Sequence, residues 1–285
     1  MKSLLQQRTI IVLGLVLIAV LIVAATGRTK LLSKDINMAV LNQQTVVVCP
    51  QGLPSCHFTQ IQDAIDVAPE GTIIVIKSGT YEENLIVRKS LTIQAAEGEQ
   101  VVVKSATESL PTLLLVNGRP IHVRVRGLTI QPARPHHGNG IEVMGMVAAR
   151  IERTIIDDYQ WGILILGKIG QLDLSELPVV IHENTIRSSI WIRECVTVTV
   201  SKNVIQHNEA PEPVGITIDD SGDIVVSENL IEGGGGVWIS QSFITMMARN
   251  IIRKNVAGVY IEGSKVFELS DNQIEQNGVG VAVAS

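Results

Sequence analysis

A four-residue pattern of Gly, an apolar residue, any residue and a second apolar residue recurs through this chain and limits its possible folds. It begins at Gly140, Gly162, Gly215, Gly236, Gly258 and Gly280, with Ser189 in one further slot. Asn followed by any residue and an apolar residue occurs at Asn184, Asn203, Asn229, Asn250 and Asn272, with Thr154 in the earlier slot. Five repeats place the second element fourteen residues after the first. A period of about 22 residues is typical of a solenoid.

Short alternating runs of Val and Ile fill each repeat, for example at 198–200 and 224–226, and we find no helical periodicity. The pattern predicts an all-β, right-handed parallel β-helix of about nine coils stacked at the strand spacing of ~4.8 Å. We expect the Gly to begin a strand at a tight corner. We expect the Asn to form the next corner in the left-handed backbone that Asn tolerates, within an internal hydrogen-bonded ladder. A leucine-rich-repeat horseshoe is the alternative, because VTVSKNVI and IVVSENLI fit its strand-plus-Asn pattern.

The N-terminus differs from the repeats. Lys2 and Arg8 precede an apolar run from Ile10 to Ala25, which predicts an export signal over residues 1–27. Its sixteen apolar residues fit either a cleaved signal peptide or a helix kept as a membrane anchor. A linker and first strand are expected over 28–57, and one β-helix over 58–285. We therefore expect a periplasmic, cell-surface or secreted protein.

The three cysteines fit an oxidising compartment if two of them pair. Cys49 and Cys56 lie seven residues apart with Pro and Gly between them, so one disulfide could close this loop; two free thiols are the alternative. Cys195 lies among strand residues and is expected to be a small buried side chain.

Residues 58–98, which include FTQIQDAIDVAPEGTIIVIKSGTYEE, resemble the start of pectin-lyase-like β-helix proteins. That group contains carbohydrate-binding proteins, sugar hydrolases, pectin methylesterases and periplasmic proteins of copper-enzyme maturation. The resemblance implies that residues from Ile61 to about Ala68 form a helix that covers the open end of the coil stack. It specifies a fold more than an activity.

Catalytic motifs of the family mostly have no counterpart here. We find no motifs that match the partners of Asp219-Asp220 in polygalacturonase-like members, which bring a His-Gly and an Arg-x-Lys pair to several Asp residues, and the Asp-Phe pair of methylesterase-like members is absent from the sequence. Adjacent strand residues face opposite ways, so Asp219 with Glu194 or Glu262 is a better carboxylate pair than Asp219 with Asp220. These four residues are weak catalytic candidates, and a lyase with dispersed Lys, Arg and Asp residues stays open.

The third position of each Gly pattern should face outward, and this file contains two of the three Trp residues. Down the stack it reads Glu142, Leu164, Trp191, Thr217, Trp238, Tyr260 and Ala282. We predict that Trp191, Trp238 and Tyr260, with Arg193 beside them, bind substrate in a groove between the long insertions at 167–178 and 208–213. The alternative is that these aromatic rings only pack beneath the insertions.

Other features suggest few further ligands. The net charge of −5 comes from scattered charges, so no nucleic-acid surface is expected, and His136-His137 lacks companions for a metal site. We expect no cofactor. At the other end, Val281 and Val283 should face the core with no amphipathic cap after Ser285, so this edge is expected to dock against a second copy or another partner, unless its small residues fray.

These observations together predict an exported β-helix protein that binds an extended polysaccharide along one sheet face. Whether it also cleaves the polymer is left open. A non-catalytic structural or scaffold β-helix of the cell envelope is the alternative function.

Overall fold

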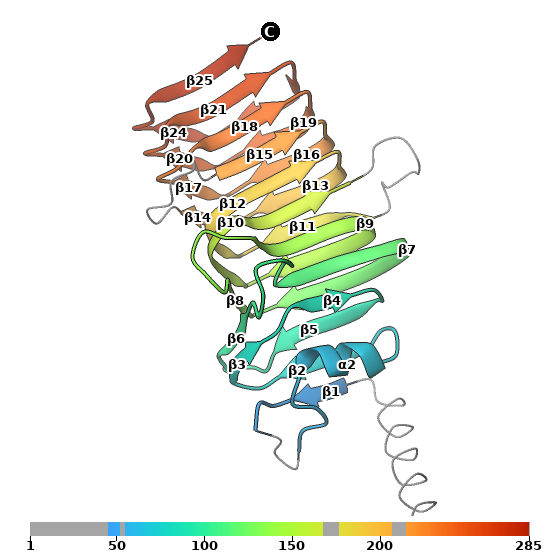
Figure 1. Ribbon diagram of the computed structural model, residues 1–285. Helices are drawn as coiled ribbons and strands as arrows, with labels where there is room; N and C mark the ends of the chain where they lie inside the picture. Colours follow the sequence, from blue (N-terminus) through green and yellow to red (C-terminus); the bar gives the residue numbers. More distant parts are fainter. Residues whose placement is uncertain (1–44, 52–54, 168–176, 207–214, 285) are drawn as a thin grey trace, which may run out of the picture. The chain divides into compact units, whose positions relative to one another are not determined.

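A computed structural model describes residues 45–51, 55–167, 177–206 and 215–284, which form a stack of β-coils (Figure 1). The predicted signal or anchor at 1–27 lies outside these residues, and so do most of the linker and both predicted insertions. Within the described ranges, no helix has the length and apolarity needed to cross a membrane.

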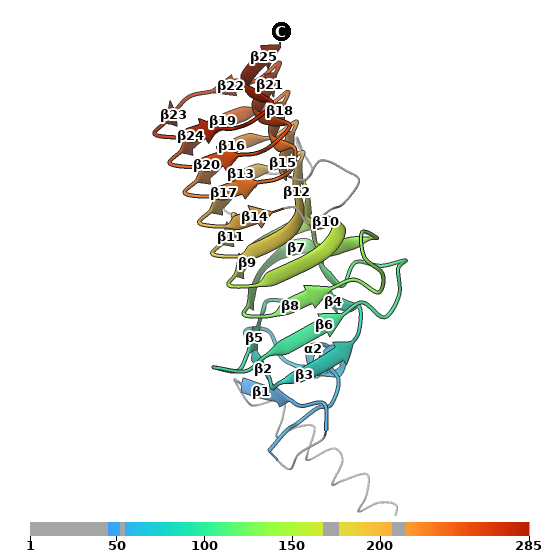
Figure 2. The same cartoon turned by 90° about the vertical axis from the view of Figure 1, so that its left-hand side faces the viewer.

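The strands pair in parallel along three ladders, and four long strands bend to join two of them (Figure 2). Sheet 1 contains β1 (Thr45–Val48), β2 (Ile73–Ile76), β5 (Leu91–Ala95), β7 (Leu113–Arg126), β9 (Asn139–Glu152), β11 (Val179–His182), β13 (Val196–Ser201), β16 (Gly222–Ser227), β19 (Phe243–Ala248), β22 (Lys265–Val266) and β23 (Leu269–Ser270). Sheet 2 contains β3 (Gly79–Glu82), β6 (Val101–Lys104), β8 (Thr129–Gln131), β10 (Ile155–Leu166), β12 (Thr185–Arg193), β14 (Val204–Gln206), β17 (Leu230–Glu232), β20 (Ile251–Arg253) and β24 (Gln273–Glu275). Sheet 3 contains β4 (Leu85–Val87), parts of β7, β9, β10 and β12, then β15 (Gly215–Asp219), β18 (Gly236–Ser240), β21 (Ala257–Glu262) and β25 (Val279–Ala284).

This arrangement confirms the predicted parallel β-helix and excludes the horseshoe, which lacks a third ladder. The core is a column of stacked apolar side chains. Ile216, Val237 and Val259 lie opposite one another in successive coils of sheet 3, and all three are fully buried. A shift of one residue in the strand pairing would turn every such side chain to the outside. Burial of these side chains therefore specifies the pairing register of the strands.

Close contact between coils explains the repeated glycines. A Cβ atom on Gly215 would clash with the carbonyl oxygen of Gly236 in the next coil, and one on Gly236 would clash with that of Ala257. Gly236 also has a left-handed backbone, with φ of 84°. The predicted tight corner is therefore real, but steric exclusion by the next coil is the more general reason for glycine.

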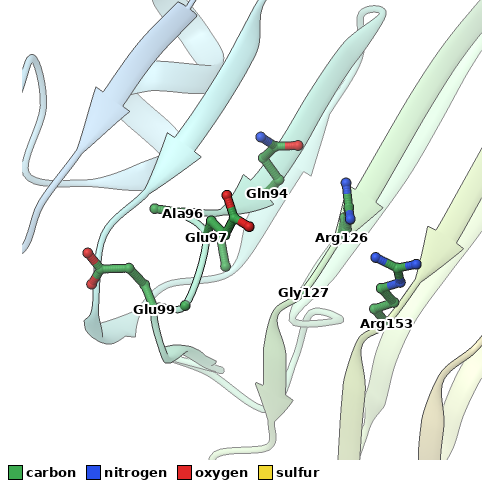
Figure 3. A pocket seen from close by; sticks show the side chains of 9 residues that line it. Gln94, Ala96, Glu97, Glu99, Arg126, Gly127 and Arg153 are labelled. Atoms are coloured by element: carbon green, nitrogen blue, oxygen red, sulfur yellow. The ribbon is translucent and has the colours of Figure 1, made fainter.

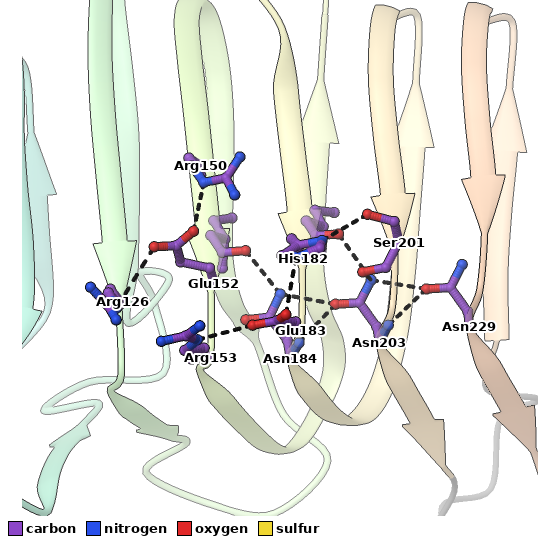
Figure 4. A network of polar contacts seen from close by, with 12 residues as sticks. Arg126, Arg150, Glu152, Arg153, His182, Glu183, Asn184, Ser201, Asn203 and Asn229 are labelled. Carbon is purple, nitrogen blue, oxygen red and sulfur yellow. Dashed lines mark hydrogen bonds and ion pairs between the residues drawn. The ribbon is translucent and has the colours of Figure 1, made fainter. Parts of the chain in front are cut away.

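The Asn residues form the predicted internal ladder (Figure 4). Asn203 donates from Nδ2 to Oδ1 of Asn229 at 3.0 Å, and Asn229 donates in the same way to Asn250 at 3.0 Å. The expectation that Asn itself is left-handed is wrong. The preceding residue has positive φ instead, as at Lys202 (56°) and Glu228 (58°), because this turn points that charged side chain outward and the following Asn inward.

Helix α2 (Ile61–Val67) covers the first coils, as the family resemblance implied (Figure 1). It buries Ile61, Ala64 and Ile65 against the stack. Its N-terminus is capped from outside the helix, because the Glu83 carboxylate accepts hydrogen bonds from the backbone N–H groups of Ile61 (2.8 Å) and Gln62 (2.9 Å). A disulfide joins Cys49 and Cys56 beside β1, with Cα atoms 5.8 Å apart.

Candidate functional site

The outward file of sheet 3 is continuous in the strand register. Trp191 lies opposite Leu164 in one neighbouring coil and opposite Thr217 in the other, and Trp238 lies opposite Thr217 and Tyr260. Two coil steps therefore separate Trp191 from Trp238, a distance of about 10 Å at the ordinary strand spacing. The three predicted aromatic residues share one surface.

The aromatic rings of this surface form two stacked pairs. The ring centroids of Trp161 and Trp191 lie 4.8 Å apart at 37°, and those of Trp238 and Tyr260 lie 4.6 Å apart at 31°. Both arrangements are tilted stacks of the kind that aromatic rings favour. Thr217 separates the pairs, so the surface presents two aromatic platforms along the stack.

Trp161 was missed by the sequence analysis. It precedes Gly162 and falls outside the slot used to find the file. An irregularity in the pairing of β10 with β12, between Trp161 and Ile163, changes which residues face one another and brings Trp161 to the ring of Trp191. Simple alternation along the strand would not have revealed this contact.

The rings differ in how they are held. Trp238 is 42% exposed, and its Nε1 donates a hydrogen bond to the carbonyl oxygen of Gly235 at 3.1 Å. Trp191 is half-buried, and its buried Nε1 has no acceptor among the described residues. The exposed Trp238 can contact a ligand, while the Trp191 ring is held by Trp161 and by Arg193.

Arg193 adds positive charge beside the aromatic surface. Its guanidinium lies 5.8 Å from the centroid of the Trp191 ring, within the range of a cation–π interaction. Its Nε is 3.5 Å from Oε1 of Glu194, and in the register it lies opposite Asp219. Hydroxyl groups of a ligand on the rings would therefore find both donors and acceptors nearby.

The candidate carboxylates lie at the end of the same strands. Asp219 accepts a hydrogen bond from Oγ of Ser240, and Ser240 also lies opposite Glu262. One coil therefore stands between Asp219 and Glu262. Glu194 and Asp220 occupy the left-handed corner positions, with φ of 54° and 44°. Arg193 and Ser240, rather than a second carboxylate, are the strand neighbours of Asp219.

The two predicted insertions consist mostly of residues 168–176 and 207–214, which are not among the described residues. The predicted groove between them is therefore not part of the described structure. Pro178 and Gly167, at the ends of the first insertion, are described.

Metal ligands do not gather in the part of the chain that the structure describes. No group of three His, Cys, Asp or Glu side chains there could hold an ion. Cys49 and Cys56 are joined, and burial raises the pKa of the Cys195 thiol to about 12. Cys195 is 4% exposed, and it takes the corner slot that Ser221 fills in the next coil, so its role is structural.

Comparisons with known proteins found one family and a similar solved structure. A family model described as "Periplasmic copper-binding protein (NosD)" matches residues 117–285. Among solved structures, pectin methylesterase PemA from Erwinia chrysanthemi is similar with a TM-score of 0.40 and 13% sequence identity, over 80% of this chain and 89% of that chain. No curated protein matches significantly.

Proposed function

This chain belongs to the NosD family of periplasmic proteins and is an exported β-helix protein, and we propose that it binds an extended polysaccharide along the outward face of sheet 3. The observation that supports this function is the pair of aromatic platforms along one continuous file, in which Trp191 stacks with Trp161 beside the file and Trp238 stacks with Tyr260 within it. Aromatic rings offer flat apolar faces to the C–H faces of sugars, and two platforms along one file could contact separate rings of a polymer.

Binding of the polymer does not require its cleavage, and whether the chain also cleaves it stays open. Asp219 accepts a hydrogen bond from Ser240, and one coil stands between it and Glu262. Glu194 is nearer, because its backbone N–H donates to the carbonyl oxygen of Asp219 at 3.1 Å. Hydrolysis by two carboxylates needs both groups around one glycosidic bond. Binding needs only the aromatic platforms and the polar groups at their side.

A screen of the full chain against a glycan array tests the proposal. We expect binding to extended glycans, and we expect replacement of both Trp191 and Trp238 by Ala to abolish it, since each stacked ring contributes on the order of 1 kcal/mol. Phe267→Ala is the matched control, because Phe267 is an aromatic residue, 74% exposed, that lies outside the file. Unchanged binding by the double variant would contradict the proposal.

A structural or scaffold role in the cell envelope is the second candidate. It is favoured by the stacking of the rings on one another and by the hydrogen bond that ties Trp238 to Gly235. In that case the double Trp variant should lower the melting temperature, and the unaltered protein should bind no glycan on the array. The two measurements therefore separate the two functions.

Copper is the ligand that the family's description names. Copper sites are built from Cys, Met and His side chains. Among the described residues, His, Cys, Asp and Glu side chains form no group of three that could hold an ion, and Cys195 is buried with a raised pKa. No step of the proposed function involves copper.

A further inference from the structure

Three arginines surround one buried carboxylate on the outward face of sheet 1. Glu152 on β9 is 6% exposed at its side chain, and its carboxylate accepts hydrogen bonds from Nε of Arg124 (2.8 Å) and Nε of Arg150 (2.6 Å). Nε of Arg126 lies 3.8 Å from the same carboxylate. Figure 4 shows Arg126 and Arg150 on different sides of Glu152. One negative charge therefore holds three positive charges, and the cluster has a net charge of about +2.

Glu152 fixes these side chains without using all their donors. A guanidinium has five N–H groups in a planar fork. Arg150 contacts Glu152 through Nε, which leaves its two terminal nitrogens without an acceptor among the described residues. Arg124 and Arg150 are each 46% exposed, so the remaining donors are accessible from solvent.

Arg124 and Arg150 line a depression of about 440 Å³ on sheet 1. His122 and Thr92 complete its polar side, together with Ser90 and Gly71. Its remaining lining is apolar and consists of Leu91, Val123, Ala148, Ala149, Pro178 and Val180. The volume falls within the range of small-molecule sites, and no Asp or Glu is among the lining residues.

A neighbouring cavity of about 450 Å³ has a different charge pattern (Figure 3). Glu97 and Glu99 lie on one side of it, and Arg126 and Arg153 lie on the other. Arg153 is already paired with Glu183 at 2.9 Å. An anion would meet repulsion from two carboxylates there, whereas the depression beside Arg124 and Arg150 has only positive and neutral walls.

We infer that the depression on sheet 1 binds a small organic anion. Its phosphate, sulfate or carboxylate group contacts the free donors of Arg124 and Arg150, because guanidinium forks match the geometry of such oxyanions. Its apolar body lies over Ala148 and Val180. Glu152 is a positioning residue that holds both guanidinium groups at the rim. The site is separate from the aromatic surface of sheet 3 and does not depend on polysaccharide binding there.

Calorimetric titration of the full chain with three probes tests both halves of this recognition. Phenyl phosphate carries the oxyanion and an apolar body, inorganic phosphate carries only the oxyanion, and benzyl alcohol carries only the apolar body. We expect phenyl phosphate to bind most tightly and benzyl alcohol not to bind. Equal binding of phenyl phosphate and benzyl alcohol, or no binding of phenyl phosphate at millimolar concentration, would overturn the inference.

Substitutions then locate the site. Replacing Arg124 and Arg150 by Gln should weaken phenyl phosphate binding by roughly tenfold to a hundredfold, as expected for the loss of charge-assisted hydrogen bonds. Arg249→Gln is the control, because Arg249 is 54% exposed, pairs with Glu228 and does not line the depression. Equal weakening by the control and the double variant would rule out this site.

Ala148→Leu provides a test that leaves the arginines in place. Ala148 is 7% exposed in the apolar lining, so a larger side chain should fill the space of the ligand's body. We expect this variant to lose phenyl phosphate binding and to keep that of inorganic phosphate. Retained binding of both probes would overturn the assignment of the apolar wall. Binding to vesicles of anionic lipid but to neither soluble probe would identify a membrane surface instead and would also overturn it.

Discussion

Glu152 shows how burial and charge compete at a single side chain. Burial raises the pKa of its carboxyl group, but hydrogen bonds from Arg124 and Arg150 and the charges of both outweigh this, so the pKa lies below its ordinary value. A carboxylate whose pKa is lower in the folded than in the unfolded state stabilises the fold above the unfolded pKa. That stabilisation is lost as the pH falls from about 4.5 through the folded pKa.

We predict that Glu152→Gln destabilises the protein by about 1–2 kcal/mol at pH 7, after allowance for the exposure of the arginines. The variant should also lose less unfolding free energy than the unaltered protein between about pH 5 and pH 3, because it lacks the titrating group. Denaturant unfolding at several pH values measures both effects.

Glu183→Gln is the control for this prediction. The pKa of Glu183 is also lowered, first by its hydrogen bond with Arg153, but its side chain is 38% exposed and solvent screens the pair. Its effect on the pH dependence should be smaller. Identical pH profiles for Glu152→Gln and the unaltered protein would show that the arginine cluster does not stabilise the fold through this charge.

Each coil has a corner at the inward Asn. The Asn side chains of successive coils form a ladder inside the stack, and the charged residues that precede them form a second ladder on its outside. The left-handed residues at this corner carry charges whose sign alternates from coil to coil; they are Arg153, Glu183, Lys202, Glu228, Arg249 and Asp271. Arg153 pairs with Glu183 at 2.9 Å, and Arg249 pairs with Glu228 at 3.6 Å. Opposite charges on neighbouring coils avoid the repulsion that like charges stacked in register would cause.

The internal ladder should contribute more, because it is buried. Asn229 is 1% exposed, donates to Val200 and Asn250, and accepts two hydrogen bonds from Asn203. We predict that Asn229→Ala destabilises the protein by about 3 kcal/mol, since it leaves buried donors and acceptors without partners. Thermal or denaturant unfolding measures the change.

The same substitution at Asn272 supplies the comparison. Asn272 also accepts from Asn250 and donates to Met247 at 2.7 Å, but it is only partly buried, so water can replace its bonds. We expect about half the cost of the Asn229 substitution. Equal costs at both positions would mean that burial does not determine the strength of the ladder.

On the scale of the whole stack, each coil is completed by its neighbours. Val281 and Val283 on β25 lie opposite Val259 and Ile261, as predicted, but are 46% and 77% exposed at the last described coil. Among the described residues, the strand that they belong to pairs with β21.

Self-association through this edge stays a prediction. If it occurs, sedimentation of the full chain at high micromolar concentration should reveal dimers, and Val281→Lys with Val283→Lys should give monomers, because lysine on an edge strand opposes pairing. Thr217→Lys, a half-exposed position in the middle of sheet 3, is the control for added charge. A monomer in every case would contradict association through β25.

The repeat in the sequence by itself determined the parallel coils, the Asn ladder and the aromatic file. In-register parallel strands place residues of one slot above one another. Residues about 22 positions apart in the sequence are therefore expected to be neighbours on adjacent coils. Trp191, Thr217 and Trp238 could therefore be assigned to one line from spacing alone. The capping helix was identified from the resemblance of residues 58–98 to a known family.

Only the tertiary structure decided which side chains meet outside this strict period. Trp161 reaches Trp191 because the strand pairing shifts beside it. Glu152 meets Arg150 on its own strand and Arg124 on β7, which precedes the first repeat. It also placed the left-handed turn on the residue before each Asn. These features depend on local irregularities and on how long side chains extend across neighbouring strands, and a periodic pattern contains information about neither.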